Sequence, residues 1–164
     1  MRTQKETFAI ALTVKNESEL LAHIIPYYLS HGASKIYIFF DGTTDDSRRI
    51  CEKYKSVELS DCVNIELLGY SRRWINELNP AEKMDHRKRI NTMYAAERAA
   101  KEGINWIASL DPDEIVLPPN GCADILDMFS LVNSNTDQII LKNIELIPKN
   151  TNLATILSSP SDCL

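Results

Sequence analysis

The feature that most constrains the fold is an alternation of short apolar runs with helical patterns. Four apolar runs are each short enough to be a buried strand, and they cover residues 8–14, 35–40, 63–68 and 104–110. Three helical segments lie between them, over residues 16–32, 46–54 and 85–102. This β-α-β-α-β-α-β order predicts an α/β fold with three α/β/α layers and a mostly parallel sheet.

The first helical segment carries recognisable end signals. Asn16 is predicted to be its N-cap, with Glu19 three residues later in a variant of the capping box. Gly32 is predicted to end the helix, because glycine readily adopts the left-handed conformation found there. Pro26 lies inside the pattern and predicts a kink near Ala22.

The pattern weakens after the fourth run. The helix at 85–102 is expected to bury one face, made of Ile90, Met93, Tyr94, Ala96 and Ala100. Residues 69–84 are predicted to be a long loop, 123–132 a helix and 138–142 a last strand. The tail after Lys149 is polar and weakly patterned, which is typical of flexible termini.

Composition narrows the class of protein. The 164 residues suffice for one domain, and the net charge of −5 argues against a nucleic-acid partner. No run of about 20 apolar residues is present, so we expect no transmembrane segment. The four cysteines are scattered, which favours reduced thiols in the cytoplasm. A cytoplasmic protein attached peripherally to a membrane is the alternative.

The stretch "SLDPDEIV" places Asp111, Asp113 and Glu114 directly after the fourth apolar run. Residues i and i+2 of an extended chain point to the same side, so the two aspartates present their carboxylates together. Pro112 favours an extended Asp111. Two adjacent carboxylates need a cation, and Mg²⁺ or Mn²⁺ suits oxygen ligands. The alternative is a solvated acidic turn.

Two other polar clusters follow the first two apolar runs, at 15–17 and 41–46. Ligands of parallel α/β sheets bind at the carboxyl ends of the strands, where all three clusters would meet. Asp41 is predicted to accept hydrogen bonds from a base or ribose. Asp45 and Asp46 are predicted to cap the next helix.

The sequence "HRKR" at 86–89 would form the first turn of a helix. Cations at a helix start oppose the helix dipole, yet they make a good anion site. A diphosphate held by Arg87, Lys88 or Arg89 on one side and a metal on the other is consistent with this arrangement. A solvated basic face is the alternative.

Taken together, "ALTVKNE", "IYIFFDGTTDDS" and "WIASLDPDEIV" resemble the family-2-like glycosyltransferases of the GT-A fold. The closest likeness is to the branch with a VKNE motif and an Asp-x-Asp-Glu motif. The resemblance covers roughly residues 7–120. It implies a single GT-A (nucleotide-diphospho-sugar transferase) domain over 1–164, with a donor-binding half at 7–120 and a short C-terminal part at 121–164.

The resemblance also implies ligands. The donor would be a nucleotide sugar, most often a UDP-sugar, and the cofactor Mn²⁺ or Mg²⁺. The acceptor would be a saccharide, lipid or protein, as in polysaccharide biosynthesis. Asp111 and Asp113 match the metal-binding aspartates. The residues expected at the donor site are Val14, Lys15, Glu17, Asp41, Arg87, Arg89 and Asp111.

The chain departs from the family pattern at two points. Pro112 separates the aspartates, and Ile115 follows where an aromatic residue is usual. Few residues follow the motif, and no catalytic base is assigned among Glu114, Asp124, Asp127 and Glu145. A truncated or degenerate domain that binds a nucleotide sugar or a protein without turnover is therefore the alternative function. A haloacid-dehalogenase-like phosphatase and a nucleotidyltransferase fit the motif order less well.

Overall fold

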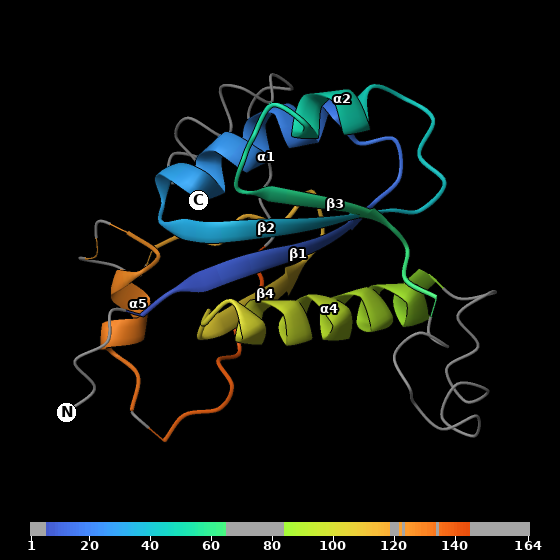
Figure 1. The fold of residues 1–164 in the computed structure, drawn as a ribbon. Helices are drawn as coiled ribbons and strands as arrows, with labels where there is room; N and C mark the ends of the chain where they lie inside the picture. The colour runs from blue at the N-terminus through green and yellow to red at the C-terminus, as the bar shows by residue number, and fades with distance from the viewer. Residues whose placement is uncertain (1–5, 65–83, 119–121, 123, 134, 145–164) are drawn as a thin grey trace.

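The computed structural model describes residues 6–64, 84–118, 122, 124–133 and 135–144 (Figure 1). Its strands form one four-stranded parallel sheet in the order β3-β2-β1-β4. The strands are β1 (Phe8–Val14), β2 (Ala33–Phe40), β3 (Val57–Asp61) and β4 (Trp106–Leu110). The helices are α1 (Ser18–Ser30), α2 (Ser47–Cys51), α4 (Met84–Lys101) and α5 (Asp127–Ser130). The predicted α/β fold class is confirmed.

Helices cover both faces of the sheet: α1 and α2 lie on one face and α4 on the other (Figure 1). All seven residues of β1 are buried, as expected for a parallel strand between two layers. Its larger side chains, such as Ile10 and Leu12, belong to the core beneath α1. Ala9 and Ala11 face α4, where they join a second core that includes other small residues, Ala95 and Ala99.

The strand order defines where a ligand site belongs. The chain moves outward from β1 to β2 to β3 and then returns through α4 to place β4 on the other side of β1. The order therefore reverses between β1 and β4, and open α/β sheets bind ligands at the carboxyl ends of strands at such a point. Val14 pairs with Phe40 and Leu12 with Leu110, so the ends of β1, β2 and β4 are adjacent.

Two strand predictions were wrong. The third strand is Val57–Asp61, not 63–68, of which only 63 and 64 are described. An edge strand packs one face, so its sequence VELSD alternates and lacks the continuous apolar run used as the criterion. Residues 138–142 form no strand, and the side chain of Ile140 is 85% exposed. Apolar character alone does not make a strand without a neighbour to pair with.

The ends of α1 follow the prediction at one terminus only. Asn16 is not the N-cap: its φ is 57°, in the left-handed region, and Glu17 takes the cap position without a side-chain cap bond. Pro26 lies inside α1, which continues to Ser30. Gly32 follows with φ of 91°, which confirms the glycine stop. A Cβ on Gly32 would lie 2.6 Å from Leu126 Cδ1, so the turn is also packed closely.

The other helices differ from prediction in extent or facing. The segment predicted at 46–54 is helical only over Ser47–Cys51, and the one at 123–132 only over Asp127–Ser130. On α4, Ile90 is buried as predicted, but Ala100 is exposed. The buried residues of that helix are Ile90, Asn91, Ala95 and Ala99. The prediction placed only apolar residues on the buried face, so it missed Asn91 and assigned the wrong face to the helix. The predicted loop at 69–84 lies outside the described residues except for Met84, which begins α4, and the tail after Lys149 lies outside them entirely.

Candidate functional site at the carboxyl edge of the sheet

The ends of β1 and β2 are joined by hydrogen bonds. The backbone N–H of Asp41 and the hydroxyl of Thr43 both donate to the carbonyl of Val14, at 2.8 and 3.1 Å. The left-handed conformation of Asn16 accompanies a side-chain contact with the same loop, because Asn16 Oδ1 accepts from the backbone N–H of Thr44 at 2.8 Å. Two of the predicted polar clusters are therefore one connected unit.

Asp45 caps two helices at once. Its carboxylate accepts from the backbone N–H groups of Ser18 in α1 and Ser47 in α2, both at 3.0 Å. Desolvation opposes ionisation of this exposed carboxyl, but hydrogen bonds from Ser47 and Ser18 together outweigh it and lower the pKa of Asp45 to about 2. Asp45 thus satisfies first-turn N–H groups of α2, as predicted, and of α1 as well. Asp46 occupies the N-cap position of α2 but makes no side-chain cap bond, and its carboxylate pairs with Arg49 instead.

The acidic motif forms a turn that rests on α1. Glu114 N–H donates to the Asp111 carbonyl at 3.0 Å, and the Asp111 N–H donates to Glu114 Oε2 at 2.9 Å. The Tyr28 hydroxyl donates to the Glu114 carbonyl at 2.9 Å and accepts from the Val116 N–H at 3.1 Å. Tyr27 adds a bond from its hydroxyl to the Val116 carbonyl at 2.9 Å. The orientation of the motif therefore depends on two neighbouring tyrosines.

The first and third clusters also interact. Burial raises the pKa of the Glu17 carboxyl, and the negative charges of Asp113 and Asp45 raise it further. Such an effect requires Asp113, which is exposed, to lie near the end of β1. The acidic groups of the first and third clusters thus lie close together near the ends of β1 and β4, where the strand order reverses.

Two cations from the start of α4 reach this edge. Arg87 binds Asp41 with two hydrogen bonds, Nε to Oδ1 at 3.1 Å and Nη2 to Oδ2 at 2.6 Å. Lys88 Nζ bonds Asp111 Oδ1. Arg87 and Lys88 therefore connect the acids that follow β2 and β4, whereas Arg89 is exposed. The sequence predicted that these cations and acids would surround a ligand, but not that they would pair with one another.

The remaining predicted donor-site residues differ in accessibility. Val14 is buried, and its carbonyl is the part that meets the loop after β2. Lys15 is exposed and Glu17 half-buried. The site residues therefore include one whose side chain belongs to the core, Val14, and others that face the edge. Their roles toward a donor stay predictions.

Asn91 is a site-supporting residue that sequence reasoning missed. It is 1% exposed, and its amide donates to Thr13 Oγ1 at 2.9 Å and Cys62 Sγ at 3.3 Å. Its Oδ1 accepts from the Val63 N–H at 2.9 Å. A polar residue beside the buried Ile90 was the available signal. The bonds fix α4 to β1 and to the segment after β3, one turn beyond Arg87 and Lys88.

The candidate ligands for a metal at this edge are two carboxylates, those of Asp111 and Asp113. In the part of the chain that the structure describes, no three His, Cys, Asp or Glu side chains converge as a cation cluster. Mg²⁺ is commonly held by one or two carboxylates together with water and substrate phosphates. Asp111 and Asp113 fit that mode. The ammonium of Lys88 forms an ion pair with one carboxylate oxygen of Asp111, which is a position that a metal ion would also take.

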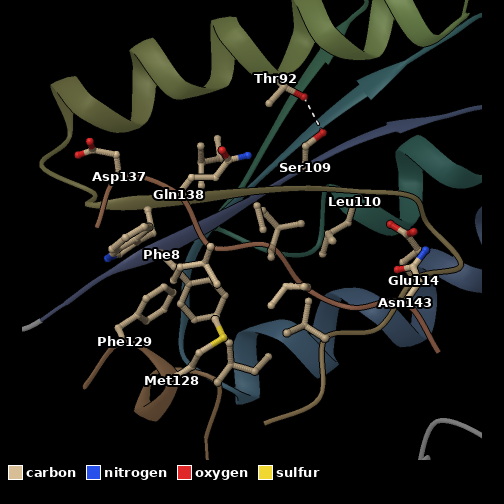
Figure 2. Close-up of a pocket in the computed structure, with 18 residues that line it drawn as sticks. Phe8, Thr92, Ser109, Leu110, Glu114, Met128, Phe129, Asp137, Gln138 and Asn143 are labelled. Carbon is tan, nitrogen blue, oxygen red and sulfur yellow. Dashed lines mark hydrogen bonds between the residues drawn. The ribbon is translucent and has the colours of Figure 1, made fainter. Parts of the chain in front are cut away.

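A cavity of about 460 Å³ runs beside β4 (Figure 2). At one end Trp106 and Phe129 stack with ring centroids 5.2 Å apart. The other end reaches Glu114 and Asn143, so the cavity borders the acidic motif (Figure 2). A volume of this size can take a small molecule.

Two of the acids considered as a catalytic base have structural partners. The carboxylate of Glu114 accepts from Asp111 N–H, and that of Asp127 accepts from Asp124 N–H at 3.1 Å. Asp124 Oδ1 is buried without a hydrogen-bond partner among the described residues. Glu145 lies outside them. The base stays unassigned.

Replacing Arg87 by methionine is expected to lower the free energy of unfolding by about 1–2 kcal/mol, because the half-buried Asp41 loses a bidentate partner. Urea denaturation at neutral pH measures the change. Arg49→Met is the matched control: its pair with Asp46 is largely exposed, so we expect a much smaller loss than for Arg87→Met. Equal losses for the two variants would contradict a special role for the Arg87–Asp41 pair.

Comparison with known proteins gives one match. A family model, Glycosyltransferase family 92, matches residues 8–153, which include all three polar clusters. No curated protein and no solved structure matches. The glycosyltransferase class implied by the sequence resemblance is confirmed, and the family matched is family 92. Among the described helices, none has both the length and the apolar character needed to cross a bilayer.

Proposed function

Because the chain belongs to glycosyltransferase family 92, we propose that it transfers a sugar from a nucleotide-diphosphate sugar to an acceptor hydroxyl. The observation that carries this proposal is the meeting of Asp41, Asp111 and Asp113 with the cationic start of α4 at the strand-order reversal. We assign the domain to the GT-A type, and the family-2-like motifs favour a UDP-sugar as donor.

The donor would lie across the carboxyl ends of β1, β2 and β4. Asp41, after β2, is positioned to contact the nucleoside, and its orientation is fixed by Arg87. Asp111 and Asp113 would hold Mn²⁺ or Mg²⁺, which supplies charge neutralisation for the departing diphosphate. The Lys88 side chain is 24% exposed, and its ammonium is the cation best placed to bind phosphate oxygens.

The acceptor would approach from the side of β4. The cavity beside this strand ends at Glu114, next to the two aspartates, and its other end offers the stacked rings of Trp106 and Phe129. Flat aromatic surfaces suit the apolar face of a sugar ring or a lipid chain. A saccharide, lipid or protein acceptor is compatible with this setting.

A domain that binds the nucleotide sugar without turnover is the second candidate. It is favoured by the hydrogen bonds that occupy Glu114 and Asp127, two of the acids considered as a catalytic base. The two functions differ in one observable. An enzyme releases UDP from a UDP-sugar in the presence of an acceptor, whereas a binding domain retains the donor intact.

Calorimetric titration of UDP with and without Mn²⁺ tests the donor site. We expect Mn²⁺-dependent binding that weakens at least tenfold in Asp113→Ala, because even indirect supports of a metal are worth that much. Asp61→Ala is the control: this exposed acid ends the edge strand β3, and its loss should leave binding within about twofold.

Absence of UDP binding by the folded protein, with or without Mn²⁺, would contradict the proposed donor. An equal loss in Asp61→Ala and Asp113→Ala would instead mean that general negative charge, not the motif, attracts the ion. A screen of UDP-sugars with UDP release as the readout then separates the enzyme from the binding domain.

A further inference from the structure

Lys88 places a cation of the chain itself in the acidic motif. Its Nζ bonds Asp111 Oδ1, and the two side chains are 24% and 43% exposed. Asp111 is one of the two carboxylates that suit a divalent ion, and Asp113 follows two residues later. A lysine ammonium is a compact point charge, unlike the planar guanidinium of arginine. It therefore neutralises Asp111 at the oxygen that a metal would use.

The backbone around Lys88 is tied to β4. Thr92 lies one turn after Lys88 in α4. Its hydroxyl donates to the Lys88 carbonyl at 2.9 Å and hydrogen-bonds the Ser109 hydroxyl at 2.8 Å. Figure 2 shows the Thr92–Ser109 contact between the helix and the strand. On the other side, Arg87 is bound to Asp41 by two bonds. Lys88 is thus presented to Asp111 from a helix start that is attached to two strands.

A divalent ion and the ammonium cannot share the Asp111 carboxylate without strong repulsion. Two positive charges about 4 Å apart repel each other substantially near a protein surface. For the metal to bind Asp111, the ammonium has to leave it. A diphosphate offers oxygens to both cations, because it ligates the metal and accepts charge-assisted hydrogen bonds from lysine.

We propose that Lys88 holds the place of the divalent cation at Asp111 until a nucleotide diphosphate arrives. Lys88 is then a positioning residue that couples metal binding to nucleotide binding, so the protein does not retain the metal alone. This inference rests on the proposed function for the identity of the metal and the diphosphate. A purely structural ion pair would contribute to folding without changing the affinity for metal.

The test is a titration of metal-free protein with Mn²⁺, followed by the electron paramagnetic resonance signal of free Mn²⁺. Without nucleotide, Lys88→Met should bind Mn²⁺ on the order of tenfold more tightly than the native chain, because the competing charge is gone. Addition of UDP should strengthen Mn²⁺ binding clearly in the native chain and much less in Lys88→Met, since the two binding events are reciprocally coupled.

Two charge controls accompany the variant. Lys88→Arg keeps the positive charge and should keep the low affinity for Mn²⁺ in the absence of UDP. Lys101→Met removes the same charge from the opposite, exposed end of α4 and should change the affinity by less than about twofold. The double variant Lys88→Met/Asp111→Asn should lose the gain, because the freed oxygen is then absent. Urea unfolding checks that each variant is folded.

Unchanged or weaker Mn²⁺ binding by Lys88→Met would overturn the proposal, as would an equal gain in Lys101→Met. The two proposals fail separately. Tighter Mn²⁺ binding by Lys88→Met without any UDP binding would support the exclusion of metal by Lys88 and contradict the nucleotide donor. UDP binding with Mn²⁺ that is insensitive to Lys88→Met would support the donor site and reject the role of Lys88.

Discussion

Replacing Asn91 by alanine is expected to lower the free energy of unfolding by about 2–4 kcal/mol. The amide of Asn91 bonds Thr13 in β1 and both Cys62 and Val63 after β3, and the residue is 1% exposed. Alanine leaves a buried hydroxyl and a backbone N–H without their partner, and it also leaves a small cavity. Both penalties act at one place, which makes this the largest loss expected from a polar residue here.

Asn105→Ala is the matched control for Asn91→Ala. The Asn105 side chain accepts two hydrogen bonds, from the N–H and the hydroxyl of Thr7, but it is exposed to solvent. Water can replace these bonds, so we expect a loss of less than about 1 kcal/mol. Urea unfolding followed by circular dichroism compares the two. A loss below about 1 kcal/mol for Asn91→Ala would show that the buried amide does not hold α4 to the sheet.

Replacing Tyr28 by phenylalanine is expected to cost about 1–3 kcal/mol and to loosen the acidic motif. The Tyr28 hydroxyl donates to the Glu114 carbonyl and accepts from the Val116 N–H, inside a side chain that is fully buried. Burial raises the pKa of Tyr28, so the hydroxyl keeps its proton and can do both. Phenylalanine preserves the ring and removes only these two bonds, so Mn²⁺-dependent UDP binding should weaken together with stability.

The neighbouring Tyr27→Phe provides the comparison. Its hydroxyl makes one bond to the same segment, donating to the Val116 carbonyl, and its side chain is less buried. We expect a loss of less than about 1 kcal/mol and UDP binding near that of the native chain. The measurements are urea unfolding and the UDP titration. If the two variants behave alike, the acidic motif does not depend on the pair of hydrogen bonds made by the Tyr28 hydroxyl.

The central strands could be predicted from the sequence because burial on both faces leaves a continuous apolar run. β1 has such a run, and β2 begins within two residues of the predicted start. The edge strand β4 is only partly buried, but its apolar sequence WIASL was also found to within two residues. The edge strand β3 was placed wrongly, since VELSD carries an alternation that suits one buried face only. Local pattern therefore identified the two central strands and the edge strand β4, and it missed the other edge strand, β3.

The sequence predicted where the acidic residues of the site lie, but not which side chains they contact. The position of Asp41 and Asp111 at strand ends follows from the order of the runs. Their pairing with Arg87 and Lys88 depends on where α4 crosses the sheet, 46 and 23 residues away in sequence. The same applies to Asn91, whose partner Thr13 is 78 residues distant. Such bonds arise from tertiary packing, which periodicity does not encode.

The alanine contact between α4 and β1 has a consequence for how the site tolerates change. Ala95 and Ala99 of the helix share a core with Ala9 and Ala11 of the strand, beside the larger Tyr37 and Phe39 of β2. The small alanines let the helix approach β1 closely, and the reach of Arg87 and Lys88 to their partners depends on that approach. A bulkier residue in place of one of these alanines would lift the helix and lengthen both distances at once. Four alanines that make no polar contact themselves thus influence the geometry of the two ion pairs at the start of the helix.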